Sequence, residues 1–389
     1  MRNNIKFVKK KIITIVGARP QIIKSSAISR AINEKFSQIL EEIIVHTGQH
    51  YDENMSEVFF HEMGIPLPNY NLNVGSGSHG AQTAKMIEGL EEIFIKEKPT
   101  AILVYGDTNS TIAGALAASK IHIPVIHVEA GLRSFNKSMP EEVNRIACDH
   151  MSTLLFTPTI SGFDNLKREG FDLDSINKAT ANTPRVYHCG DVMFDNSLYF
   201  STVSDEKSII LDKIGLKANE YILSTIHRDS NTDISDNLES IFKALLQIQN
   251  NSKLSIVLPI HPRTRGKMKD QLTKGLFQQI EENPYFKIID PAGFLDIIAL
   301  EKNSKMIITD SGGLQKEAYF FQKPCIILRP QTEWVEIIEN GNALLAEANF
   351  DKIINSFEIL NSKIDYTYPS LYGDGKAAEF ICEKIIEHL

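Results

Sequence analysis

"TDSGGLQKEA", residues 309 to 318, places an acid, a hydroxyl group and two glycines directly after the apolar run at 306–310. A run of helix-forming residues follows at once. This order predicts a buried strand, a tight turn at Ser311-Gly312-Gly313 and the start of a helix. Such a junction directs free backbone N–H groups and the positive end of a helix dipole at one spot, where Gly lacks the Cβ that would hold a ligand away. The stretch therefore predicts an anion site, and a turn with Ser as its N-cap is the plainer alternative.

Short β-branched runs recur along both halves of the chain, with helical patterns between them. They lie at 12–16, 42–47, 101–106, 124–129 and 153–158, and again at 221–227, 255–261, 286–291, 306–310 and 324–329. This alternation indicates right-handed βαβ units on parallel sheets. We therefore predict an α/β fold with two Rossmann-like, doubly wound domains that face a cleft, and function at the carboxyl ends of the strands.

The length of the chain favours two domains, because 389 residues exceed one hydrophobic core of ordinary size. A polar, weakly patterned stretch at 172–185 suits the connection. We predict an N-terminal domain over residues 1–180 and a C-terminal, ligand-binding domain over residues 186–370.

Composition excludes several classes of function. The chain is 42% hydrophobic and 23% charged, as soluble globular proteins are, and its net charge of -8 argues against a nucleic-acid binder. The four cysteines form no CxxC pair, so we expect a reduced, cytoplasmic protein without disulfides or a metal site. The apolar stretch at 12–16 is too short for a signal core, and no run approaches the ~20 residues of a membrane helix.

Ionisable side chains follow the predicted strands as a set. They are Arg19 and Lys24, Asp107, Glu129 and Arg133, His227 and Arg228, His261 and Arg263, and Asp310 with Ser311. For any single residue, a helix cap, or an acid hydrogen-bonded within its own turn, is the plainer interpretation. Parallel sheets bring the carboxyl ends of their strands to a common crevice, so the set predicts a functional site.

Several long motifs stand in order along the chain: "GARPQIIK", "GDTNST", "HVEAGLRS", "MPEEVNR", "HPRTR", "DSGGLQKEA" and "YGDGKAAE". Together they resemble the non-hydrolysing UDP-N-acetylglucosamine 2-epimerase family nearly end to end. The resemblance implies a fold like that of GT-B glycosyltransferases, with the last helix (372–389) crossing back to the first domain. It also implies a homodimer, a UDP-sugar substrate and no cofactor.

The implied reaction is a reversible inversion at carbon 2 of a UDP-linked 2-acetamido sugar, for cell-surface polysaccharide precursors. UDP is eliminated and then added back to the other face of a glycal-like intermediate. The carbon 2 proton has no adjacent carbonyl, so it leaves only as the anomeric phosphate departs. That chemistry needs a base, an acid on the opposite face, and cations or dipoles for the leaving diphosphate.

The resemblance assigns residues to these roles. The implied catalytic residues are Asp107, Glu129, Glu141 and His227. The implied ligands of UDP and substrate are Arg19, Lys24, Arg133, His261, Arg263, Ser311, Gly312, Gly313 and Glu317. Glu317 suits ribose hydroxyl groups, since a carboxylate accepts two hydrogen bonds. Which carboxylate is the base and which the acid stays open.

Two segments depart from the common family pattern. Residues 17–21 read GARPQ where the family commonly reads GTRPE, and residues 332–336 read TEWVE where it commonly reads TERPE. Gln21 and Trp334 both resemble the subgroup that acts on UDP-2,3-diacetamido-2,3-dideoxyglucuronate, so we expect that sugar to turn over faster than UDP-N-acetylglucosamine. If Gln21 faces the sugar, its neutrality matters, because two unit charges ~6 Å apart repel by roughly 3 kcal/mol at an effective dielectric of 20.

Two further alternatives remain. Some bacterial family members carry a second, activating UDP-sugar site at a Q-H-R-E-M motif, of which Gln49 and His50 match here. A GT-B glycosyltransferase would share the fold and nucleotide site but would need a cleft for an acceptor. The carboxylates of GDT, HVE and PEE favour the epimerase.

Overall fold

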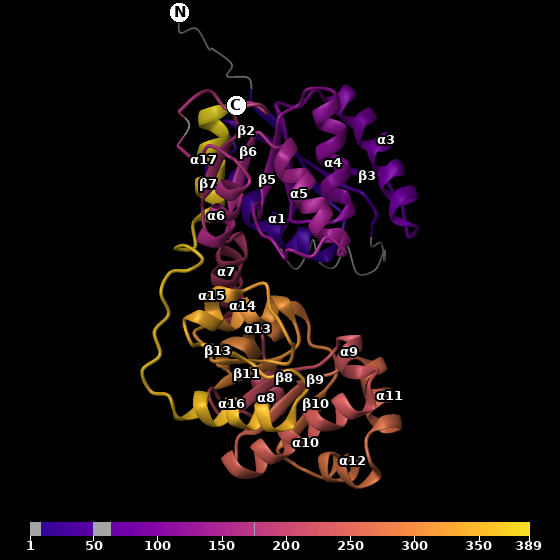
Figure 1. Cartoon of the computed structure of the whole chain (residues 1–389), viewed down its shortest axis with the longest axis vertical. Helices are drawn as coiled ribbons and strands as arrows, with labels where there is room; N and C mark the ends of the chain where they lie inside the picture. Colours follow the sequence, from indigo (N-terminus) through magenta and orange to yellow (C-terminus); the bar gives the residue numbers. More distant parts are fainter. Residues whose placement is uncertain (1–8, 50–63, 175) are drawn as a thin grey trace, which may run out of the picture. The chain divides into compact units, whose positions relative to one another are not determined.

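The computed structural model describes residues 9–49, 64–174 and 176–389. The chain divides into two compact units, one formed by Met1–Asn196 with Ser370–Leu389 and the other by Ser197–Pro369. Each unit contains one parallel sheet with helices packed on it (Figure 1). The predicted α/β class with two Rossmann-like units is confirmed.

The first unit contains a seven-stranded sheet with the order β3-β2-β1-β4-β5-β6-β7. Its strands are β1 (Lys10–Val16), β2 (Leu40–His46), β3 (Tyr70–Asn71), β4 (Ala101–Tyr105), β5 (Val125–Val128), β6 (Leu154–Thr157) and β7 (Arg185–His188). The chain order reverses between β1 and β4. In doubly wound sheets such a reversal leaves a crevice at the carboxyl ends of the two strands, where ligands bind.

Helices cover both faces of this sheet. They are α1 (Arg19–Ala31), the short π-helix η1 (Ile32–Phe36), α3 (His79–Glu97), α4 (Asn109–Lys120), α5 (Pro140–Met151), α6 (Ile160–Arg168), α7 (Val192–Lys207) and α17 (Ala377–His388). Successive side chains of a strand point to opposite faces. Ile12 of β1 accordingly packs with α1 and α17, whereas Ile13 and Ile15 pack with α3 and α4.

Helix α17 joins the first unit from the far end of the chain (Figure 1). Its residues Ile381 and Ile385 are fully buried in the cluster that also holds Ile28 of α1. The carboxylate of Asp195 accepts hydrogen bonds from the N–H groups of Ala377 and Ala378, at 3.2 and 2.7 Å. This cap satisfies backbone donors that the first turn of a helix leaves without partners. Burial raises the pKa of Asp195 to about 6.

The second unit contains a six-stranded sheet with the order β10-β9-β8-β11-β12-β13. Its strands are β8 (Tyr221–Thr225), β9 (Ser255–Pro259), β10 (Phe286–Ile289), β11 (Met306–Thr309), β12 (Cys325–Ile327) and β13 (Ala343–Leu345). Its helices are α8 (Ile210–Ile214), α9 (Asp229–Thr232), α10 (Ser235–Ser252), α11 (Pro262–Gln271), α12 (Lys274–Glu281), α13 (Phe294–Asn303), α14 (Gly312–Phe320), α15 (Val335–Glu339) and α16 (Phe350–Ser362). Here the chain order reverses between β8 and β11.

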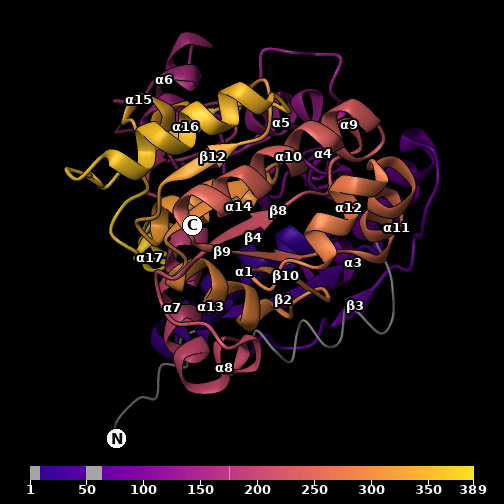
Figure 2. The same ribbon diagram turned by 90° about the horizontal axis from the view of Figure 1, so that it is seen from below.

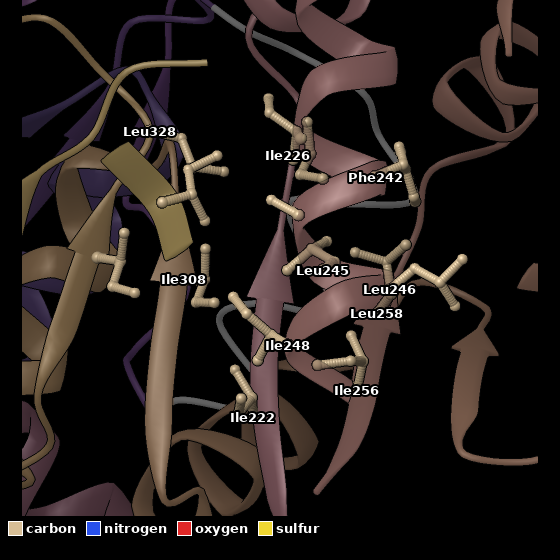
Figure 3. Close-up of a cluster of buried hydrophobic side chains, with 14 of the residues drawn as sticks. Ile222, Ile226, Phe242, Leu245, Leu246, Ile248, Ile256, Leu258, Ile308 and Leu328 are labelled. Carbon is tan, nitrogen blue, oxygen red and sulfur yellow. The ribbon is translucent and has the colours of Figure 1, made fainter. Parts of the chain in front are cut away.

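Helix α10 supplies much of the core of the second unit. Figure 3 shows side chains of this helix, among them Phe242 and Leu245, in one buried cluster with Ile222 of β8 and Ile256 of β9. Helix α16 packs beside α10 (Figure 2). Burying an aliphatic or aromatic side chain of this size contributes about 1.5–3 kcal/mol, so this face anchors the strands that carry the site.

The structure differs from the sequence-based expectation at the edges of the sheets and at the boundary. The edge strands β3, β7 and β13 were not predicted. Because β7 belongs to the first sheet, the units divide after Asn196, inside α7, and not within the polar stretch at 172–185. Among the described residues, no helix combines the length and apolar character needed to cross a membrane.

Candidate functional site

In the first unit, polar residues gather at the crevice between β1 and β4. Gly17 and Ala18 follow β1, and Arg19 begins α1 with an exposed side chain. Gly106 follows β4 with a φ of +62°, a backbone region that glycine enters without strain, and Asp107 comes next. The crevice therefore has a cationic residue on one side and an acid on the other.

Lys24 and Glu129 form an ion pair at this crevice. The ammonium of Lys24, on α1, contacts the Glu129 carboxylate directly after β5, and both side chains are largely buried. Burial alone would lower the pKa of Lys24, but Glu129 and Asp107 more than offset it, so its pKa lies above the usual value. Glu129 adopts a φ of +72°, an uncommon and strained conformation for a residue with a side chain. Such strain persists where surrounding contacts enforce it, often at functional sites.

Asp107 lies in contact with α5. Its carboxylate pairs with the guanidinium of Arg145, and its backbone carbonyl accepts a hydrogen bond of 3.0 Å from Asn144 Nδ2. Burial raises the pKa of Asp107, and the nearby Glu129 raises it further, against the opposing effect of Arg145 and Lys24. Asp107 therefore holds a proton more readily than an exposed aspartate does.

The two glutamates at the start of α5 have different environments. Glu141 is exposed, whereas Glu142 is buried and accepts hydrogen bonds from the N–H groups of Ser134 and Phe135, at 2.9 and 3.0 Å. Residues three and four apart share a helix face, so Glu141 lies on the face whose Asn144 and Arg145 contact Asp107. Glu142 fastens a loop, and Glu141 is the glutamate available to a ligand.

Arg133 occupies a different position from the other predicted ligands. Its side chain is 1% exposed, and its guanidinium lies 2.7 Å from Asp149 and 2.6 Å from Glu169. Asp149 also binds His127 at 2.7 Å, and the other ring nitrogen of His127 lies 2.8 Å from the carbonyl of Gly106. Burial works against a charged His127, but Asp149 is among the groups that raise its pKa well above the usual value. Arg133 thus supports the loop that carries Asp107, and its geometry does not favour a ligand role.

Gln21 and Gln49 are both engaged within the protein. The Gln21 side chain is 2% exposed and hydrogen-bonded at both ends of its amide, so the condition on which the charge argument depended, that Gln21 faces the sugar, is not met. The argument that a neutral residue 21 favours a charged sugar is therefore not supported. Gln49 Oε1 accepts hydrogen bonds from the backbone N–H and the hydroxyl of Ser110, at 3.1 and 2.7 Å. His50, the other residue of the predicted second site, lies outside the described residues.

In the second unit, Asp310 organises the crevice between β8 and β11. Its buried carboxylate lies 2.8 Å from His227 Nδ1 and accepts hydrogen bonds from the N–H groups of His227 and Arg228. Burial alone would raise the pKa of Asp310, but hydrogen bonds from His227 and Arg228 hold it below its usual value. The ionised aspartate fixes the tautomer of His227, whose ring is about half exposed at the crevice.

Ser311 and Gly312 form the predicted turn at the start of α14. Ser311 Oγ caps the helix by accepting a hydrogen bond of 3.4 Å from the N–H of Leu314. Neither Gly312 nor Gly313 has a positive φ, so the turn does not require glycine for its conformation. A Cβ at Gly312 would lie 2.7 Å from Glu333 Oε1. Glu333 Oε1 is the end of a flexible side chain that can move aside, so neither backbone conformation nor this contact requires a glycine at the position.

The Trp334 side chain is hydrogen-bonded to this turn. Its Nε1 donates a hydrogen bond of 3.0 Å to the carbonyl of Gly312, and Lys316 lies 4.0 Å from the centre of its ring. The side chain is buried. The tryptophan therefore has a structural role that its sequence context alone did not reveal.

The remaining predicted ligands lie on α14 and α11. Glu317 is on the second turn of α14, near Glu301 of α13. The pKa of Glu301 is raised well above the usual value by burial and by the nearby charge of Glu317. His261 is exposed and caps α11, with Nδ1 accepting a hydrogen bond of 3.3 Å from the N–H of Arg263. The Arg263 guanidinium is held by Asp229 and Asp233.

Two residues at the first crevice, Arg145 and Asn144, were absent from the predicted site, and both contact Asp107. Arg228, which belongs to the predicted strand-end set, donates from Nε to the carbonyl of Asp310 at 2.9 Å. Arg145 stands four residues after Glu141, between two predicted strands, and this spacing was the available signal. Among the described residues, no group of three His, Cys, Asp or Glu side chains is arranged to hold a metal ion.

The chain is similar along nearly its whole length to proteins of one family. A family model described as UDP-N-acetylglucosamine 2-epimerase matches residues 32–386. A Methanococcus maripaludis protein, named UDP-N-acetylglucosamine 2-epimerase homolog, is 49% identical over 374 residues, covering 96% of this chain and 98% of that one. A Pseudomonas aeruginosa protein, named UDP-2,3-diacetamido-2,3-dideoxy-D-glucuronate 2-epimerase, is 48% identical with the same coverage. The crystal structure of Methanocaldococcus jannaschii UDP-GlcNAc 2-epimerase in complex with UDP-GlcNAc and UDP matches with a TM-score of 0.80 and 40% identity, covering 97% of this chain and 99% of that one.

Proposed function

The chain belongs to the UDP-N-acetylglucosamine 2-epimerase family, and from that premise we propose that it inverts carbon 2 of a UDP-linked 2-acetamido sugar. The observation that carries the proposal is the pair of carboxylates at the ends of β4 and β5, each held by a cation: Asp107 by Arg145 and Glu129 by Lys24. A proton must leave one face of carbon 2 and return to the other, so the reaction needs more than one acid–base group.

The proposed reaction has two balanced steps. In the first, a carboxylate takes the proton from carbon 2, the C2–H electron pair forms a double bond to carbon 1, and UDP leaves with the electrons of the C1–O bond. In the second, UDP adds back to carbon 1 while a proton is delivered to the opposite face of carbon 2. The raised pKa of Asp107 suits the group that delivers a proton, and Glu129 and Glu141 are the candidates for the base.

We assign UDP to residues of the second unit. The N-terminus of α14 offers backbone N–H groups and a helix dipole to the diphosphate, and Ser311 and Gly312 stand at that end. Glu317 suits the ribose hydroxyl groups. In its doubly protonated form His227, oriented by Asp310 at Nδ1, can donate from Nε2 to the departing phosphate as negative charge develops on it. We also propose Arg19 as a cation for the diphosphate. Arg263, already held by two aspartates, has a supporting role.

For the physiological substrate we propose UDP-2,3-diacetamido-2,3-dideoxyglucuronate, with UDP-N-acetylglucosamine as the alternative. The support is the 48% identity to the Pseudomonas aeruginosa protein that carries this substrate in its name, against 41% to the Methanocaldococcus jannaschii protein named UDP-N-acetylglucosamine 2-epimerase. The alternative is kept because the relative at 49% identity is named UDP-N-acetylglucosamine 2-epimerase homolog. We further propose a homodimer in the cytoplasm that supplies precursors of a cell-surface polysaccharide. The free thiols of Cys148, Cys189, Cys325 and Cys382 fit a reducing compartment.

Proton NMR in deuterated water tests both the reaction and the substrate. Each UDP-sugar is incubated with the protein alone, without any acceptor. We expect deuterium at carbon 2 together with the epimeric product, and a higher kcat/KM for the diacetamidoglucuronate. A glycosyltransferase would leave carbon 2 protonated in the absence of acceptor, and that result would reject the epimerase. A higher kcat/KM for UDP-N-acetylglucosamine would reject only the substrate assignment.

Amide substitutions test the carboxylates. Asp107→Asn, Glu129→Gln and Glu141→Gln should each lower kcat by about 10²-fold or more, the usual size of a general acid–base contribution. Affinity for UDP, measured by calorimetry, should change little, because UDP is assigned to the second unit. The matched control is Glu358→Gln, an exposed glutamate on α16. Any of the three that turns over like the control has no part in proton transfer.

Gly312→Val tests the anion site at α14. The added side chain would collide with Glu333 and fill the space next to the first N–H groups of the helix. We expect UDP to bind at least about 10-fold more weakly, a loss of ~1.4 kcal/mol, in a protein that still folds. Gly275→Val is the control, because a Cβ at that helical glycine meets open space. Equal UDP affinity in the two variants would make the α14 turn purely structural.

A further inference from the structure

The amide of Gln21 spans the crevice between β1 and β4. Its Oε1 accepts hydrogen bonds from the N–H groups of Gly17 and Ala18, at 2.9 and 3.2 Å. Its Nε2 donates to the carbonyl of Tyr105 and to the hydroxyl of Thr111, each at 3.0 Å. With 2% of the residue exposed, every polar atom of the side chain is used inside the protein.

This bridge lies beyond the point where the two strands stop pairing. The register of β1 with β4 ends at Thr14 and Leu103, whereas β1 continues to Val16 and β4 to Tyr105. Strands on the two sides of a chain reversal diverge at their carboxyl ends, which is what opens the crevice. Gln21 therefore replaces the missing ladder hydrogen bonds with a side-chain link.

The two ends of the link lie next to groups assigned to the reaction. Gly17 and Ala18 immediately precede Arg19, and Tyr105 lies two residues before Asp107. We propose that Gln21 is a positioning residue, which holds the turn carrying Arg19 at a fixed distance from the strand end carrying Asp107. This inference rests on the proposed function, because it takes the roles of Arg19 and Asp107 from it.

The chemistry of the link requires an acceptor at one end and a donor at the other. A glutamine amide supplies both in every protonation state. A carboxyl group supplies both only while it is protonated, and burial favours that neutral form at low pH. A methionine has the same length and supplies neither. A displacement of ~1 Å in a catalytic group can cost about 10²-fold in rate, so loss of the link should affect kcat.

The test compares Gln21→Met and Gln21→Glu with the parent. We expect Gln21→Met to lower kcat by about 10-fold or more at every pH. Gln21→Glu should recover most of kcat near pH 6, and its kcat relative to the parent should fall at least about 10-fold by about pH 9, as the introduced carboxyl ionises. The control is Gln249→Glu, a buried amide of α10 bonded to Asn283, which should follow the parental pH profile.

A parental kcat for Gln21→Met would overturn the inference, as would a constant ratio of Gln21→Glu to parent across the pH range. Hydrogen–deuterium exchange separates this outcome from failure of the proposed function. Loss of the link should speed amide exchange in both 17–21 and 105–109 in Gln21→Met. If the parent shows no epimerase activity but both segments respond, the function is wrong and the link stands. If the segments exchange at the parental rate, the link is rejected whatever the activity.

Discussion

Parallel pairing combined with a reversal of chain order is the constraint on which the rest of this structure depends. All pairings among the described strands are parallel, so each sheet gathers the carboxyl ends of its strands at one edge. At each reversal the neighbouring chains diverge, and backbone groups lose their ladder partners. A polar side chain takes over in both units: Gln21 between β1 and β4, and Asp310 between β8 and β11. The same demand for satisfied backbone groups thus shapes two unrelated local sequences.

The carboxylates at the first crevice are neutralised by paired cations and not by solvent screening. Glu129 pairs with Lys24, and Asp107 pairs with Arg145. Each of the two neighbouring carboxylates therefore has its own cation. Behind them, His127 joins the Gly106 carbonyl to Asp149, which also holds Arg133. A buried network of this kind is stable only when every member has a partner. It makes the backbone before Asp107 stiff, which acid–base chemistry at a fixed distance requires.

The fold was largely predictable because long apolar runs carry the central strands. The edge strands β3, β7 and β13 are two to four residues long, and such short segments have too little periodicity to be recognised. The order of the motifs located the crevices. It could not predict that the Arg133 side chain is buried in an ion-pair network, whereas Glu141 is exposed. Gln21 shows the reason most directly. Its neutral side chain suggested tolerance of a charged sugar, whereas its partner Tyr105 lies 84 residues away in the chain and meets it only in the folded sheet.

The order of the units along the chain has a consequence for biosynthesis. Residues 197–369 form the second unit, and the helix that completes the first unit's buried face follows them. During translation the strands of the first unit emerge early, yet Ile28 and its neighbours lack the cover of α17 until residues 377–388 have left the ribosome. The second unit, by contrast, is contiguous and can fold while synthesis continues. At ~5–20 residues per second the exposed apolar face persists for about ten seconds or more, which makes the nascent first unit the part that chaperones would have to protect.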